Sequence, residues 1–236
     1  MTDRQATILQ AIVEHYVKDA NPVGSQTLSQ YFNVSPATIR AEMAALEEEG
    51  YITHPHTSAG RLPTDLGYRF YVNNLKKREP GADSRMAHVL EQRIASAGEP
   101  EQAIRSAVHS LMETTHSLAM ASAGPQLYMR GLSNLLTQPE FGDVARIHSL
   151  AQLLDNIEPW LREISPTQKV SVYIGSENPI GKSSGASMVI SRFRSPISEY
   201  NYVGVVGPTR QSYGRVISLV SFAAKTLEEE LNDKLR

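Results

Sequence analysis

The sequence contains no cysteine among its 236 residues. This absence excludes disulfide bonds, thiolate zinc sites, iron–sulfur clusters and cysteine nucleophiles. No stretch approaches 18 consecutive apolar residues, and the first residues lack the basic and then apolar pattern of a secretion signal. We therefore expect a soluble, cytoplasmic protein that crosses no membrane.

Neither sign of charge dominates, because 23 Lys and Arg residues oppose 25 Asp and Glu residues and give a net charge of −2. Such totals disfavour a strongly basic nucleic-acid-binding protein. The distribution of the charges is more informative than their sum. Residues 51–64 contain no acidic side chain, whereas Glu47, Glu48 and Glu49 stand together just before them.

The length and a hydrophobic fraction of 41% allow one large or two ordinary domains with packed cores. Residues 1–77 predict three helices, a hairpin and a fourth helix, in that order. The first expected helix begins at Thr2 or Asp3 and ends at Asn21, and the second begins with a cap at Ser25 and extends past Phe32. The third has a cap at Ser35 and a C-cap at Gly50. The hairpin follows with its tip at residues 57–60, and the fourth helix extends from Thr64 or Asp65 to about Lys77.

Beyond these residues the pattern changes to a mixture of helices and strands. Residues 76–81 combine basic side chains with a Pro-Gly breaker and are interpreted as a hinge. Residues 84–122 predict two helices with a break at 98–100. The other expected elements are helices at 143–157 and 216–231 and strands at 170–174, 187–194 and 201–206. The fold class is therefore α+β.

The order of elements in the first part is typical of a winged helix-turn-helix, whose third helix enters the major groove of DNA. Four residues at the start of that helix suit this role: Ser35, Ala37, Thr38 and Arg40. Small side chains allow a close approach, a hydroxyl can bond a base edge or a phosphate, and Arg can bind guanine in a bidentate manner. The alternative interpretation of Arg40 is a surface side chain paired with a nearby Glu.

The hairpin is the expected wing, which would lie against the phosphate backbone. It carries His54, His56 and Arg61 and no acidic residue. The Glu run at 47–49 is expected at the opposite end of the third helix, away from the DNA. Two His residues around a Pro without a nearby carboxylate or Cys do not favour a metal site, and we expect no metal or cofactor.

Several runs resemble the heat-inducible transcription repressor HrcA family. The resemblance is dense over residues 3–73 and continues through most of the chain. The runs that carry it are Pro22–Ser25, Val34–Arg40, Pro55–Thr64, Gly67–Arg69, Gly131–Leu136, Gln138–Phe141, Ile174–Asn178 and Val205–Tyr213. It implies a winged helix-turn-helix domain at 1–78, a helical linker or dimerisation segment at 79–125 and a GAF-like α+β regulatory domain at 126–236.

The resemblance also implies a function. Family members are dimeric repressors that bind an inverted-repeat operator, CIRCE, ahead of chaperone operons; the GroE chaperonin keeps them active, and heat stress relieves repression. The DNA contacts implied by position are bases for Ser35, Ala37, Thr38 and Arg40, phosphates for Ser25, Gln26 and Thr27, and wing contacts for His56, Thr57, Ser58 and Arg61, supported by Tyr68 and Arg69.

This chain departs from the family in three respects, of which the smallest is Glu49 in place of a common Leu before Gly50. Ala41 stands where the family usually has Asn, so a polar contact with DNA is missing or the operator differs. The chain is also about a hundred residues shorter than usual, which implies that a dimerisation insert is reduced or absent. The dimer would then rest on residues 84–122, although intrachain packing of these helices is the simpler alternative.

Other chemistry is less well supported. Residues 175–183 end in Gly-Lys-Ser but have five residues between the glycines, with a Pro among them, and lead into a strand, so a solvated hairpin loop is expected and not a phosphate-binding loop. Residues 204–208 lack the third Gly of a dinucleotide-binding turn. No nucleophile, base and orienting group emerge together, so no enzyme is expected. The competing functional hypothesis is a GAF-like domain that senses a small molecule.

Overall fold

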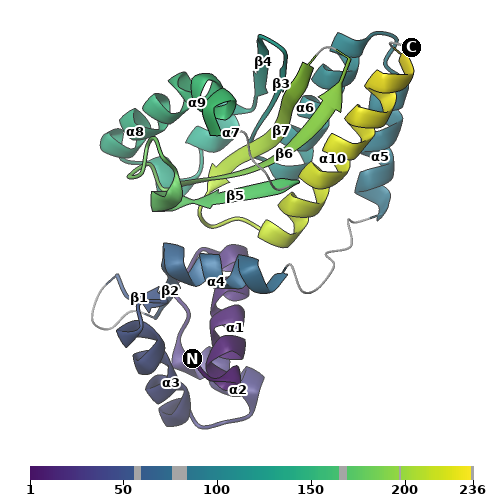
Figure 1. Cartoon of the computed structure of the whole chain (residues 1–236). Helices are drawn as coiled ribbons and strands as arrows, with labels where there is room; N and C mark the ends of the chain where they lie inside the picture. The colour runs from purple at the N-terminus through teal and green to yellow at the C-terminus, as the bar shows by residue number, and fades with distance from the viewer. Residues whose placement is uncertain (56–59, 76–83, 165–168, 197, 235–236) are drawn as a thin grey trace. The chain divides into compact units, whose positions relative to one another are not determined.

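The computed structural model describes residues 1–55, 60–75, 84–164, 169–196 and 198–234 (Figure 1). The chain forms two compact units, Met1–Glu79 with Arg210–Ser212, and Pro80–Thr209 with Tyr213–Arg236. The expected hinge at 76–81 lies outside the described residues.

The first unit begins with three helices close to the predicted positions. Helix α1, Asp3–Asp19, is capped by Thr2, one of the two predicted caps. The Thr2 side chain accepts a hydrogen bond from the Gln5 N–H, and the Gln5 side chain accepts one from the Thr2 N–H. Helix α2 is Ser25–Phe32, and its N-cap is Gly24 instead of the predicted Ser25. Ser25 already has helical geometry and cannot serve as its own cap.

Helix α3, Pro36–Glu48, has Ser35 as its N-cap and Pro36 in its first turn, as predicted. Its C-cap is Glu49, and the predicted cap Gly50 follows with φ of +80°. The N–H groups of Gly50 and Tyr51 donate to the carbonyls of Glu47 and Leu46, which is the Schellman ending that a left-handed glycine permits. This ending turns the chain directly from α3 into the wing.

The predicted hairpin is confirmed. Strand β1, Ile52–Thr53, pairs antiparallel with β2, Leu62–Pro63. The segment between α1 and α2 adds a third piece that the sequence did not predict, because the N–H and carbonyl of Val23 both bond to the backbone of Arg61, at 2.8 and 2.9 Å. Helix α4, Asp65–Leu75, follows and is capped by the hydroxyl of Thr64.

The second unit is built on one antiparallel sheet in the order β4-β3-β7-β6-β5. The strands are β3 Leu118–Ala123, β4 Gln126–Arg130, β5 Val170–Ile174, β6 Ala186–Ser195 and β7 Ser198–Pro208. The three predicted strands are β5, β6 and β7. The prediction that the second helix continues to residue 122 is wrong, since β3 begins at Leu118. All six of its residues are buried, so no helical or alternating pattern marks it.

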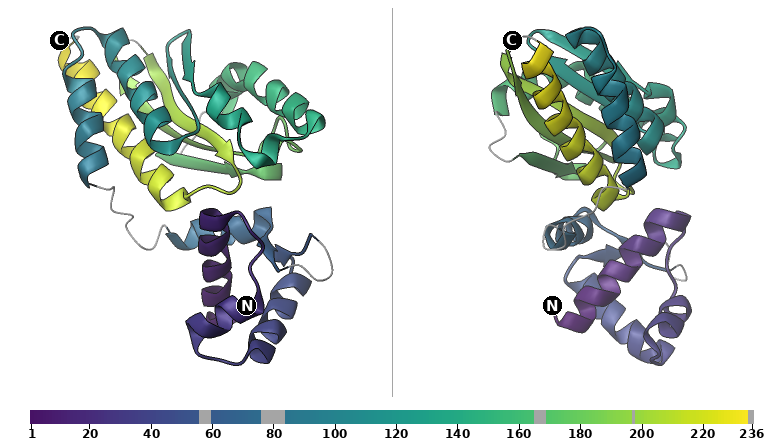
Figure 2. Two further views of the ribbon diagram at one scale, coloured as in Figure 1. Left: turned by 180° about the vertical axis from the view of Figure 1, so that it is seen from behind. Right: turned by 90° about the vertical axis from the view of Figure 1, so that its right-hand side faces the viewer.

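Helices cover both faces of this sheet (Figure 2). On one face lie α5 Ser84–Ala95, α6 Pro100–Thr115 and α10 Tyr213–Lys234, with α10 along β6 and α6 along β3. The other face carries α7 Leu132–Leu136, the short 3-10 helix Pro139–Phe141, α8 Val144–Asp155 and α9 Ile157–Ile164. The mixed architecture confirms the α+β fold class.

The predicted boundary between residues 125 and 126 needs correction. It would cut the β3–β4 hairpin, whose strands pair from Ala119 with Arg130 to Ala123 with Gln126. Helices α5 and α6 pack on each other, on α10 and, through α6, on β3. Residues 84–125 therefore belong to the same unit as the sheet, and the apolar stripes of α5 and α6 are explained by intrachain packing.

Candidate DNA interface

The N-terminal turn of α3 is held by two of the predicted site residues. The Oγ of Ser35 accepts a hydrogen bond from the N–H of Thr38 at 3.1 Å, and it lies 2.8 Å from the Oγ1 of Thr38. Both hydroxyls therefore have a structural role in capping α3. Ser35 is exposed and Thr38 half-buried, and each oxygen retains hydrogen-bonding capacity for a partner in solvent.

As far as Ala44, one face of α3 is small and uncharged except for Arg40. The buried side chains Ile39, Met43 and Leu46 anchor the helix to its unit. The exposed positions on the opposite side follow helical spacing and consist of Ala37, Arg40, Ala41 and Ala44, with Glu48 on the same side in the last turn. This stripe lets the backbone approach a flat or grooved surface closely, with a single guanidinium projecting from it.

Arg40 is exposed and forms no ion pair with any residue that the structure describes. The alternative in which a neighbouring Glu neutralises Arg40 is therefore not seen among these residues. The nearest acidic neighbour along the helix, Glu42, instead lies 3.9 Å from Arg4. The guanidinium of Arg40 keeps its five donors available for a planar partner such as a guanine edge.

The start of α2 offers backbone donors beside α3. Its N-cap, Gly24, makes no side-chain capping bond. Gln26 and Thr27 are exposed and Ser25 is half-buried at this end of the helix. Uncapped N–H groups and the positive end of a helix dipole favour an anion such as a phosphate.

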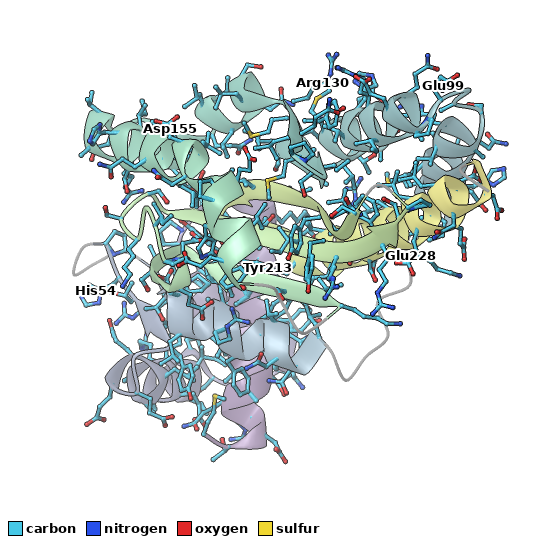
Figure 3. All side chains as sticks on the ribbon, turned by 45° about the horizontal axis from the view of Figure 1, so that its top comes forward. His54, Glu99, Arg130, Asp155, Tyr213 and Glu228 are labelled. Carbon is cyan, nitrogen blue, oxygen red and sulfur yellow. The ribbon has the colours of Figure 1, made fainter. Side chains whose placement is uncertain are left out.

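Glu47 ties the wing to the end of α3, so one residue of the Glu run that was expected away from the DNA contacts the base of the wing. The Nε and Nη2 of Arg61 lie 2.9 and 2.8 Å from the Oε2 of Glu47. The Nδ1 of His54 bonds the other carboxylate oxygen, and Figure 3 labels His54 beside the wing. Glu48 and Glu49 are exposed and do not share this contact.

This pairing changes the acidity of Glu47. Burial of the carboxyl raises its pKa, but the hydrogen bond from His54 and the positive charge of Arg61 outweigh the burial and hold the pKa below its ordinary value. The carboxylate is therefore ionised at neutral pH and neutralises Arg61 at the base of the wing.

The remaining predicted residues of the wing are distributed differently. His56, Thr57 and Ser58 lie outside the described residues. Tyr68 has only 2% of its surface exposed, so its side chain lies in the core of the first unit and not on the surface that would face DNA. Arg69 is half-buried on the same helix. The expectation that these two residues support the wing stays a prediction.

The wing requires a glycine at position 60, which the sequence pattern alone did not indicate. A Cβ at Gly60 would lie 2.6–2.7 Å from the backbone of Pro22 and Val23. Only glycine allows this close approach, and the Val23–Arg61 bridge depends on it. The position of Gly60 directly before Arg61 was the available signal.

The phosphate-binding interpretation of residues 175–183 has no structural support. The segment joins the antiparallel strands β5 and β6 and no helix follows it. It is the expected hairpin loop with mostly exposed residues, although Asn178 is fully buried and its Nδ2 donates to the carbonyls of Gly175 and Ala186, both at 2.8 Å. Asn178 therefore holds the loop closed.

The ligand-sensing hypothesis is also not favoured. The space between the sheet and α7–α9 is occupied by a cluster of large buried side chains, which includes Phe141, Leu150, Trp160 and Met188. Trp160 packs edge-on against Tyr173 with ring centroids 4.9 Å apart. Within the described ranges, no three His, Asp or Glu side chains are grouped to hold a metal ion, and no helix has the length and apolarity to span a membrane.

Comparison with known proteins identifies related chains. An HTH domain family matches residues 7–58, and the family described as HrcA protein C terminal domain matches residues 72–217, more than half of the chain. A solved structure described as a hypothetical protein superposes with a TM-score of 0.84 at 20% identity and covers 99% of both chains, which shows the shared fold.

Full-length relatives are named heat-inducible transcription repressor HrcA. The protein from Desulforamulus reducens is 27% identical over 343 aligned positions, covering 100% of this chain and 99% of the relative. The one from Halalkalibacterium halodurans is 26% identical over 337 positions, covering 99% and 98%. These alignments exceed the 236 residues of this chain by about a hundred positions, so the chain is shorter than these relatives by about that length. The chain belongs to the HrcA family.

Proposed function

We propose that this protein is a sequence-specific transcription repressor that controls chaperone genes through an inverted-repeat operator of the CIRCE type. The single observation that carries the proposal is the exposed face of α3, where Arg40 lies among small side chains and forms no ion pair with the described residues. Membership of the HrcA family and the names of the full-length relatives support the heat-shock role.

In the proposed complex α3 enters the major groove. Arg40 binds a guanine edge, Ala37 allows the helix to approach, and Ser35 and Thr38 bond base edges or phosphates with the capacity that remains after capping. The start of α2, with Ser25, Gln26 and Thr27, lies on the phosphate backbone. The wing contacts the DNA backbone or the minor groove through His56, Thr57 and Ser58, and Tyr68 and Arg69 support it.

A dimer follows from the way such helices read DNA. One recognition helix reads only a few base pairs, and two symmetric half-sites multiply the discrimination. We propose a homodimer in the cytoplasm that associates with the nucleoid when bound to its operator. We further propose that the GroE chaperonin supports the active repressor and that heat stress relieves repression.

The test is binding of the full chain to a duplex with a CIRCE-type inverted repeat and to a scrambled duplex of the same composition, at roughly physiological salt. We expect the inverted repeat to be bound at least a thousandfold more tightly, about the lower end for specific recognition. Equal affinity for both duplexes would contradict the proposal. Adding the chaperonin under folding conditions should increase the active fraction, and no increase would remove the chaperonin from the proposal.

A further inference from the structure

The ion pair between Glu47 and Arg61 lies at the junction of the two elements that the proposed function places on DNA. Glu47 stands in the last turn of α3, and Arg61 directly precedes β2 of the wing. The side chains are 24% and 25% exposed, so the contact is partly shielded from solvent. A shielded pair with two short N···O distances holds its geometry better than an exposed surface pair.

Two further ties act at the same place. His54, which follows β1, bonds the second oxygen of Glu47, so the carboxylate joins both sides of the hairpin. The backbone of Arg61 is held by Val23 through two hydrogen bonds. The base of the wing is therefore tied to α3 by side chains and to the α1–α2 connection by backbone.

The pairing has an electrostatic consequence. A Lys or Arg that neutralises a phosphate releases a counterion and contributes about 0.9 to the slope of log affinity against log salt concentration. Arg61 is already neutralised by Glu47, and its Nε and Nη2 point at the carboxylate. In this arrangement Arg61 adds geometry to the wing instead of a phosphate contact.

We propose that Glu47 is a positioning residue that determines specificity, by holding Arg61 in the base of the wing and keeping its charge from non-specific contact with phosphates. This inference rests on the proposed function as a DNA-binding repressor. It differs from the expectation drawn from the sequence, in which Arg61 itself contacts the DNA backbone.

The proposal predicts opposite effects for the two partners. In Glu47→Gln, a change that keeps the size of the side chain and removes its charge, Arg61 becomes available to phosphates. We expect higher affinity for scrambled DNA, a salt slope steeper by roughly 1, and a several-fold loss of the ratio between operator and scrambled DNA. In Arg61→Gln we expect an unchanged salt slope and a similar loss of that ratio.

The matched control is Glu48→Gln, which changes the net charge equally at an exposed residue that forms no ion pair with the described part of the chain. It should leave the ratio between operator and scrambled DNA unchanged. In the double variant Glu47→Gln with Arg61→Gln, the steeper slope of Glu47→Gln should disappear, because the effect acts through Arg61.

The experiment is the salt dependence of binding of the full chain to both duplexes for the wild type and these four variants, with thermal unfolding to check folding. If Glu47→Gln behaves like Glu48→Gln, or if Arg61→Gln flattens the salt slope by about 1, the proposal is wrong. The Arg61→Gln result decides even if Glu47→Gln does not fold. A wild type that does not distinguish the duplexes would instead contradict the proposed function.

Discussion

The carboxylate of Glu47 lies 2.8 Å from the Nη2 of Arg61 and joins the recognition helix to a wing residue 14 positions further along the chain. An ionised side chain therefore links helix and wing at this point. Substitutions and changes of pH can therefore test the DNA binding and the stability of the first unit.

Replacing Arg40 by Ala should weaken operator binding by about 1–3 kcal/mol and relax the preference at one base position. The reason is that Arg40 is an exposed cation among the small side chains of the first turns of α3. A binding titration against duplexes substituted at single positions measures both effects. Lys225→Ala, which removes an exposed cation from α10 in the other unit, is the control and should change neither. An unaltered base preference in Arg40→Ala would show that another residue reads the base.

Replacing Gly60 by Ala should destabilise the first unit by about 1–3 kcal/mol, the usual cost of forcing extra volume into a tight contact. The added Cβ would press on the backbone of Pro22 and Val23 and separate Val23 from Arg61. Denaturant unfolding gives the change in free energy. Gly98→Ala is the control, because a Cβ there meets no atom within 4 Å and Gly98 caps no helix. Equal stability of the two variants would contradict this account of the wing.

The contact made by Glu47 should depend on pH. The pKa of Glu47 is lower in the folded protein than its ordinary value of 4.5. Its contribution is therefore fully present above that ordinary pKa and is lost as the pH falls through the lower folded pKa. The free energy of unfolding should thus differ between wild type and Glu47→Gln at neutral pH, and the difference should shrink in acid. A difference that stays constant down to strongly acidic pH would show that ionisation of Glu47 is not its source.

Replacing Trp160 by Ala should destabilise the second unit by about 3–5 kcal/mol. Trp160 is 6% exposed and belongs to the cluster between the sheet and α7–α9. Because it is the single tryptophan of the sequence, its fluorescence in the wild type reports the unfolding of this unit alone. The variant itself is followed by circular dichroism. Val144→Ala, at a residue of α8 that is 80% exposed, should change stability by no more than about 0.5 kcal/mol. A similar stability of the two variants would show that the cluster is not a packed core.

Prediction from sequence succeeded where the signals are local. Helices α1 and α3 were predicted from their apolar spacing and their caps at Thr2 and Ser35. It failed at β3, where six consecutive buried residues carry neither a helical nor an alternating pattern and where the strand follows directly on α6. Helix α9 was missed for a related reason, since it follows α8 almost without a break and extends the same amphipathic stretch.

For the candidate site the same division holds. The chain order alone predicted that Ser35, Ala37 and Arg40 would lie at the start of α3, because capping and helical spacing are properties of neighbouring residues. Only the tertiary structure decided what Glu47 does. Glu47 and Arg61 are too far apart in the sequence for their contact to be predicted from neighbouring residues. The contact exists because the Schellman ending at Gly50 folds the wing back onto α3. A sequence shows which charges are present, whereas the fold decides which of them neutralise one another and which are left to bind DNA.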